Sequence, residues 1–342
     1  MTQTFIHLRV ELIEKRFHEI EILLEQAVTK KSDGLLYATF CRSAHVLLVA
    51  HFEGMVKDIV KDVLDDLNNN LSFKESPTQI KRTYCHYYLN KNDRGDYDEV
   101  SIKKLIETFD ELPTKLKIEP FLFENNKNPN PYIIDTILKK FGVKNFFMLL
   151  KNSDLDIVFQ NIKSDTNTLK ERLKNYLTEN LVEYPYNVAE SFYNPENPTS
   201  TQSQPRTLWQ TFLDDFLNDR HSIVHGNTLE NPKDHEEIAE AMAKIHVLIY
   251  AFIISVCRIA TIKIAVIEQE PILVNVEQHD DDEQQEMEYS QFEREKQEKE
   301  KEGYIHEGGY IACPAVGGDH ELELWTKEGS SVEVCQFCQT VS

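Results

Sequence analysis

Arg220 and His225 stand five positions apart in the run RHSIVH, residues 220–225. The Arg220 guanidinium is permanently charged and can hold two phosphate oxygens, while the His225 imidazole titrates near neutral pH and can move a proton. Phosphate binding and proton transfer are the two requirements of RNA cleavage without a metal ion. The pair is therefore the first candidate for a catalytic site.

An amphipathic helix is predicted to position Arg220. Its apolar stripe recurs at helical spacing through Trp209, Phe212, Leu213, Phe216 and Leu217. Arg220 continues the stripe three residues later, so it should face packed surface rather than open water. Gly226 is a suitable C-cap for this helix, and a cationic His225 in the last turn is favoured by the helix dipole.

The spacing of Arg220 and His225 alone is weak support, because both residue types are frequent enough for one such spacing to arise by chance. The context adds weight. An apolar stripe precedes the pair, the break His-Gly-Asn follows it, and a long apolar helix comes next.

Helices are predicted elsewhere by the same periodicity. Segments 5–28 and 35–67 form an antiparallel hairpin around the break Ser32-Asp33-Gly34. Three shorter helices are predicted near 101–111, 132–141 and 165–181. Asn231-Pro232 supplies an N-cap and a first-turn proline for a helix that runs to about 267.

The net charge of −21 argues against broad, non-specific binding of nucleic acid, because phosphate affinity comes mostly from positive charge. Residues 277–302 hold 12 acidic and 4 basic side chains, a net of −8, which leaves −13 for the rest. An RNA site must therefore be a local basic patch, selective for a structured target and assembled between subunits.

The most apolar run, Ile245–Cys257, is shorter than the roughly 20 residues that span a bilayer, so a buried helix is predicted and no membrane partner. The N-terminal segment is charged from Arg9 onward and has no apolar stretch of signal-peptide length. A cytoplasmic location is expected.

The segment NDRHSIVHGN resembles the HEPN superfamily of all-helical ribonucleases, whose signature is an Arg followed by four to six residues and a His. The segments RSAHVLLVAHFEGMVKDIV, residues 42–60, and NPYIIDTILKKFG, residues 130–142, are similar to the MAE-type HEPN-like nucleases of prokaryotes. The resemblance covers roughly residues 5 to 268.

This resemblance implies an all-α fold with an up-and-down bundle of four core helices. It also implies a homodimer that brings two Arg/His sets together, and a role in antiphage defence or as a toxin, with an antitoxin or defence-system protein as partner. By position, Arg220 would neutralise the cleaved phosphate and His225 would be the general acid or base. The RNA's own 2′-hydroxyl would attack and leave a 2′,3′-cyclic phosphate, with no cofactor required for catalysis.

Four further residues are catalytic candidates with ordinary alternatives. His221 follows the arginine, and Asn218 and Asp219 precede it; they could orient the phosphate or the imidazole, although a solvated helix end offers the same residues a simpler role. Glu53 matches a position where related sequences carry an acid, but a surface glutamate is an equal reading.

Two alternatives to an active enzyme remain open. Arg220 and His225 could be a helix-end pair bonded to local carbonyls or carboxylates. The chain could also be an inactive HEPN module that binds proteins or nucleotides. A related branch that partners nucleotidyltransferases carries a Tyr two residues after the His, where this chain has Asn227, which makes an antitoxin role of that kind less favoured.

The C-terminal tail resembles a zinc ribbon with one incomplete knuckle. Strands are expected at 321–325 and 332–334. Val316 stands where a second cysteine would complete the first knuckle, so His320 would have to be the fourth ligand of a structural zinc. The ligand set would be Cys313, His320, Cys335 and Cys338. A metal-free ribbon and a redox use of the cysteines are the alternatives.

Five segments follow from these patterns. They are a first helical hairpin (1–70), a mostly helical insertion (71–206), the motif-bearing helices (207–270), an acidic linker (271–303) and the zinc-ribbon-like tail (304–342).

Overall fold

The chain divides into two compact units, Met1–Glu268 and Gln269–Ser342. The computed structural model describes residues 3–91, 97–122, 129–160, 162–188, 192, 206–224, 233–261, 305–306, 322–327 and 330–335. Within the described part of the first unit, every regular element is helical, as the all-α prediction requires.

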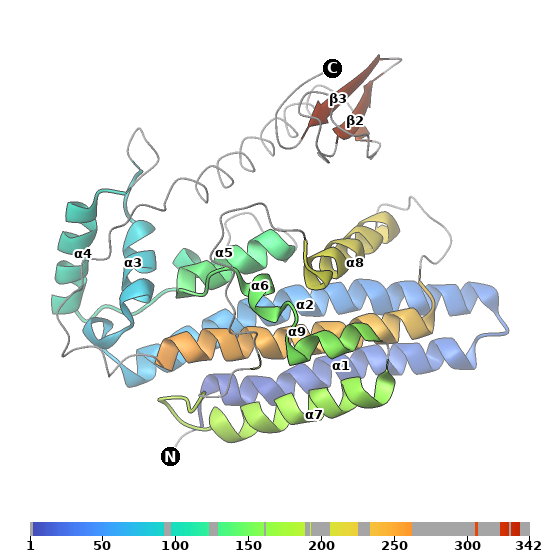
Figure 1. Cartoon of the computed structure of the whole chain (residues 1–342), viewed down its shortest axis with the longest axis horizontal. Helices are drawn as coiled ribbons and strands as arrows, with labels where there is room; N and C mark the ends of the chain where they lie inside the picture. Colours follow the sequence, from blue (N-terminus) through green and yellow to red (C-terminus); the bar gives the residue numbers. More distant parts are fainter. Residues whose placement is uncertain are drawn as a thin grey trace. The chain divides into compact units, whose positions relative to one another are not determined.

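The first unit contains long helices joined by shorter ones (Figure 1). The α-helices are α1 (Phe5–Thr29), α2 (Gly34–Asn70), α3 (Thr78–His86), α4 (Glu99–Glu111), α5 (Pro131–Phe141), α6 (Phe146–Leu150), α7 (Lys163–Asn180), α8 (Leu208–Val224) and α9 (His235–Thr261). Three 3₁₀ turns lie between them, η1 (Phe73–Glu75), η2 (Glu119–Phe121) and η3 (Asp154–Gln160). The helices predicted near 5–28, 35–67, 101–111, 132–141 and 165–181 are confirmed.

Helices α1, α2, α7 and α9 form a bundle in which α1 packs on α2, α2 on α9, α9 on α7 and α7 on α1. The four helices lie side by side in Figure 1. Helix α7 comes from the range 71–206 that was predicted as an insertion, and it completes the bundle. Helix α8 lies outside these four helices and packs on α2, α5 and α6.

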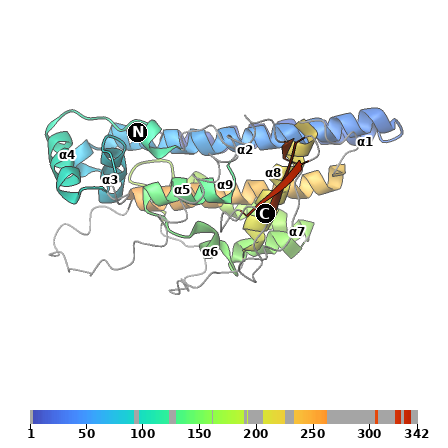
Figure 2. The same ribbon diagram turned by 90° about the horizontal axis from the view of Figure 1, so that it is seen from above.

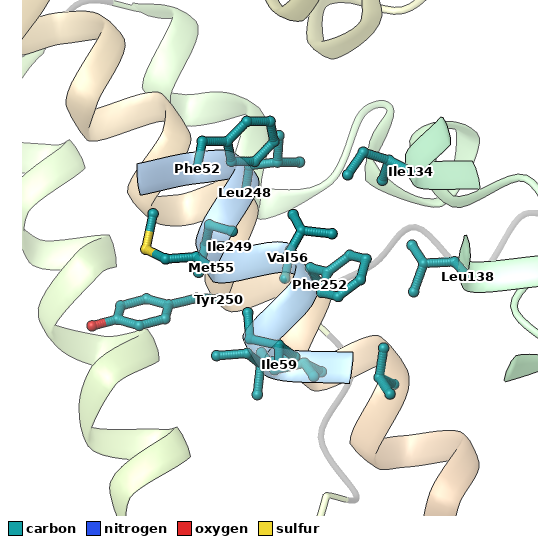
Figure 3. Packing of buried hydrophobic residues seen from close by; sticks show 14 of the residues in the cluster. Phe52, Met55, Val56, Ile59, Ile134, Leu138, Leu248, Ile249, Tyr250 and Phe252 are labelled. Atoms are coloured by element: carbon teal, nitrogen blue, oxygen red, sulfur yellow. The ribbon is translucent and has the colours of Figure 1, made fainter. Parts of the chain in front are cut away.

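The bundle core follows from the apolar stripes of its helices. Residues of α2, α5 and α9 interlock, and Figure 3 shows Phe52, Ile134 and Phe252 among them. Each of these three side chains is at most 1% exposed. Truncating Phe52 to alanine would cost on the order of 3–5 kcal/mol, because the close-packed neighbours cannot collapse into the space.

One polar cluster joins three bundle helices. Glu14 of α1 accepts hydrogen bonds from His246 Nε2, at 2.7 Å, and from the Tyr250 hydroxyl, both on α9. Lys174 of α7 lies 3.2 Å from the same carboxylate. Burial raises the pKa of Glu14, but these partners outweigh it and lower the pKa to about 2. The ionised carboxylate therefore helps to hold α7 against α1 and α9.

The segment NPYIIDTILKKFG, residues 130–142, forms helix α5 and its two caps. Asn130 accepts a hydrogen bond from Ile133 N at 2.9 Å as N-cap, and Pro131 occupies the first turn. Gly142 ends the helix with a φ of 103°, a left-handed conformation that favours glycine. Asp135 accepts from Phe146 N at 3.0 Å and so joins α5 to α6.

Helix α9 begins at His235, later than the predicted start at Asn231-Pro232. Asp234 is the cap, since its carboxylate accepts from Glu236 N and Glu237 N at 2.8 and 2.9 Å. The Glu237 carboxylate in turn accepts from Asp234 N at 2.8 Å. Helices α2 and α9 are long and apolar enough to cross a membrane by composition. In α9, 78% of the most apolar window is buried within the protein. This agrees with the buried helix that the sequence predicts.

The described part of the second unit is an antiparallel sheet in the order β1 (Ile305–His306), β2 (Leu322–Lys327) and β3 (Ser330–Cys335). Strands β2 and β3 pair from Leu322 opposite Cys335 to Lys327 opposite Ser330. They overlap the two strands expected at 321–325 and 332–334. Figure 2 gives a second view of the helices of the first unit.

Candidate active site

Arg220 lies in the last two turns of α8, on the side of the helix that packs. Phe212, Phe216 and Arg220 follow one another at intervals of four residues and share a face. Phe216 is buried, Arg220 is half-buried, and the guanidinium has no hydrogen bond or ion pair with any residue that the structure describes. A half-buried cation without a counterion is able to receive an external anion.

His45 of α2 anchors the same turn of α8. Its imidazole is 1% exposed, and Nε2 donates to the Phe216 carbonyl at 3.0 Å. In an α-helix this carbonyl is also the acceptor for the backbone N–H of Arg220, four residues on. The His45 ring packs on the Phe216 ring, with centroids 4.9 Å apart. The backbone that carries Arg220 is thus tied directly to the bundle.

Burial lowers the pKa of His45, although the Phe216 hydrogen bond and the negative charge of Asp219 act in the opposite direction. Because Nε2 donates to a carbonyl, the neutral ring has its lone pair on Nδ1. Nδ1 is buried and has no partner in the described part of the chain. His45 is therefore held as a neutral donor near neutral pH.

Two further contacts fix the start of α9 next to the end of α8. The Tyr37 hydroxyl of α2 accepts from His235 N at 3.2 Å and forms a second hydrogen bond with His235 Nδ1 at 3.0 Å. Asp219 Oδ2 is buried and lies 2.7 Å from Lys233 Nζ, an ion pair without hydrogen-bond alignment. Hydrogen bonds to α2 and the ion pair between Asp219 and Lys233 therefore fix the residues that flank segment 225–232.

The structure places the other sequence candidates as follows. His225 lies outside the described residues, as does Gly226. Asn218 and His221 are exposed on α8, and His221 has an interaction partner. Asp219 is paired with Lys233 as described above, which favours a structural role in closing the turn.

Glu53 is not brought to Arg220 by any contact among the described residues. It lies on α2 with its carboxylate 2.7 Å from Lys57 Nζ, four residues on, as a surface helix pair would. This geometry fits the alternative in which Glu53 is an ordinary surface glutamate.

Three residues that support the site were missed by sequence reasoning, namely His45, Tyr37 and Lys233. His45 lies inside the segment 42–60 that carries the family resemblance, which was the one available signal. Tyr37 and His45 are eight residues apart on one face of α2, but nothing in the sequence identifies their partners.

Metal chemistry is not indicated in the described part of the chain, where no group of three or more His, Cys, Asp or Glu side chains could hold an ion. Of the proposed zinc ligands, Cys313, His320 and Cys338 lie outside the described residues, and Cys335 is described only as the last backbone position of β3.

The family model described as RiboL-PSP-HEPN matches residues 11–258, a range that runs from α1 almost to the end of α9. The chain belongs to the RiboL-PSP-HEPN family. HEPN domains are typically ribonucleases, and HEPN nucleases are generally metal-independent. The match supports the HEPN superfamily predicted from the sequence, whereas the MAE-type subgroup stays a prediction.

Comparison with curated proteins and with solved structures gave no significant match. The assignment to the HEPN superfamily therefore rests on the family model, the helical architecture and the motif around Arg220.

Proposed function

We propose that the chain is a metal-independent endoribonuclease in which Arg220 binds the scissile phosphate and His225 transfers protons. The RNA 2′-oxygen loses its proton and forms a bond to phosphorus, and the bond from phosphorus to the 5′-oxygen breaks. The 5′-oxygen takes up a proton, and the other fragment ends in a 2′,3′-cyclic phosphate. His225 acts as general acid or base in these proton transfers.

The observation that carries this proposal is the state of Arg220. Its half-buried guanidinium has no counterion in the described residues and lies one turn beyond a carbonyl that His45 fixes. A phosphate bound there would neutralise the cation, and the negative charge that grows on the phosphate during cleavage would bind more tightly still.

The same proposal includes a biological setting that comes from the family resemblance alone. A homodimer would bring two Arg/His sets together, and the activity would serve antiphage defence or act as a toxin restrained by a partner protein. The MAE-type subgroup belongs to this setting. A cytoplasmic location is proposed separately, from the charged N-terminal segment.

The test is cleavage of total RNA by the purified protein in EDTA, followed by analysis of the new ends. Wild type should leave cyclic phosphates, and the variants Arg220→Ala and His225→Ala should each lose at least about 100-fold in rate. Arg258→Ala, at an exposed position of α9, is the matched control and should cleave normally. Cleavage that survives both substitutions would overturn the mechanism, and a wild type that binds RNA without cutting it would favour the inactive binding module.

A further inference from the structure

Lys244 of α9 is a second cation that packs against α8. Its ammonium lies over two aromatic rings, 5.4 Å from the centroid of Phe159 and 5.5 Å from that of Phe212. Phe159 belongs to η3 and Phe212 to α8, so the lysine side chain fills the junction of three elements. The aromatic faces attract the cation, but they do not neutralise its charge.

No residue in the described part of the chain forms a hydrogen bond or an ion pair with Lys244. Two charged side chains influence it from a distance, Glu240 one turn earlier on α9 and Lys233 before the helix. Burial lowers the pKa of Lys244, the like charge of Lys233 lowers it further, and Glu240 partly opposes both. The ammonium is therefore partly desolvated, and among the described residues only the more distant Glu240 opposes its charge.

Lys244 and Arg220 are connected through described contacts. The ring of Phe212 that Lys244 covers stacks on Phe216, with centroids 5.9 Å apart, and Arg220 follows on the same face of α8. Lys233, which influences Lys244, is paired with Asp219 beside Arg220. The Cα atoms of Phe212 and Arg220 are eight residue steps apart on α8, a rise of about 12 Å along the axis at 1.5 Å per residue.

Lys244 and Arg220 stand on different helices, and the Phe212 ring that Lys244 covers is about two helical turns from Arg220 along α8. We propose that Lys244 binds a second backbone phosphate of the same RNA strand, a few nucleotides from the phosphate that Arg220 holds. This inference rests on the proposed ribonuclease function and deepens it. Lys244 and Arg220 together would give the acidic chain a short track of positive charge. Tight binding would then need a substrate of several nucleotides.

The experiment measures binding of a fluorescent RNA in which every sugar is 2′-O-methylated, so that it cannot be cleaved, over a series of salt concentrations. Lys244→Met keeps the apolar stem over the two rings and removes the charge, whereas Lys244→Arg keeps a charge. Lys15→Met, at an exposed position of α1, is the control for loss of one positive charge.

Lys244→Met should weaken binding roughly three- to tenfold at low salt and reduce the slope of log Kd against log salt by about one. Lys244→Arg should restore most of the affinity. Replacing single phosphates by neutral methylphosphonates should reveal one position whose replacement weakens wild type and leaves Lys244→Met unchanged.

Equal binding by wild type and Lys244→Met, or equal losses in Lys244→Met and Lys15→Met, would overturn the inference. The proposed ribonuclease function is tested separately, by measuring cleavage of unmodified RNA by wild type. A wild type that binds RNA in a Lys244-dependent way without cutting it would keep the second phosphate site and remove the ribonuclease. A wild type that neither binds nor cuts would remove both.

Discussion

At the scale of single residues, His45 is the side chain that connects the candidate catalytic turn to the core. Its Nε2–H adds a second donor to the Phe216 carbonyl, and its ring fills space against the Phe216 side chain. A leucine would fill similar space and lose the hydrogen bond, while a glutamine could still donate to the carbonyl. The two substitutions therefore separate positioning from packing.

We expect His45→Leu to lower kcat of RNA cleavage about tenfold, an increase of about 1.4 kcal/mol in the activation barrier, with little change in KM. His45→Gln should recover most of that loss, because it can keep the hydrogen bond. Steady-state kinetics on one short RNA would measure both. Equal kcat values for His45→Leu and wild type would rule out a positioning role.

The lowered pKa of His45 also has a consequence for stability. The unfolded chain takes up a proton near pH 6.5 while the folded chain does not, so this contribution to stability is complete above about pH 6.5 and is lost as the pH falls toward the folded pKa. His45→Gln does not titrate. Urea unfolding at pH 7.5 and 5.5 should therefore show wild type losing stability on acidification relative to this variant.

At the scale of elements, the sequence patterns were sufficient for the long helices and insufficient for their assembly. Apolar periodicity located α1, α2, α5 and α7 within a few residues. It could not show that α7 completes the bundle, because one amphipathic stripe fits any apolar partner. The cap of α9 was misplaced for a related reason, since Asn231 and Asp234 are both good caps and the bond to Glu237 distinguishes them.

The candidate site, like the fold, was predicted only in part. The chemistry of Arg220 could be inferred from its residue type and its place on an apolar stripe. The supporting contacts of His45 and Tyr37 join residues that are far apart in the chain, and no local pattern encodes them.

Two glycines provide a matched test of helix ends. Gly142→Ala should destabilise the protein by about 1–2 kcal/mol, because φ is 103° there and the new methyl group would lie 3.3 Å from Gln79 Cγ. Gly34→Ala, in the first turn of α2 with open space around it, should be neutral or stabilise by up to about 1 kcal/mol. Thermal unfolding of the two variants would compare them directly, and similar shifts in Tm would contradict this account.

At the scale of the whole molecule, the candidate catalytic residues and the proposed zinc ligands belong to different units. The candidate catalytic pair belongs to Met1–Glu268, while the four proposed zinc ligands belong to Gln269–Ser342. Four protein ligands would leave no open position for substrate or water on such a metal. A zinc ion in the tail would therefore be structural.

Elemental analysis of the purified protein should find one zinc per chain, and Cys338→Ser should lower that content. Removal of the metal with a strong chelator should leave the rate of RNA cleavage unchanged, because the proposed mechanism uses no metal. A parallel loss of zinc and cleavage would contradict the separation of the two units. A metal-free protein would support the alternative of a degenerate ribbon.

The position of α8 outside the bundle has a thermodynamic consequence. Helices α1, α2, α7 and α9 contact one another around a closed ring without it, so opening of α8 would leave those contacts in place while exposing the buried Trp209, Leu213 and Phe216. The free energy of that local opening must be smaller than that of global unfolding. Hydrogen exchange would report it as faster exchange in residues 208–224 than in α9.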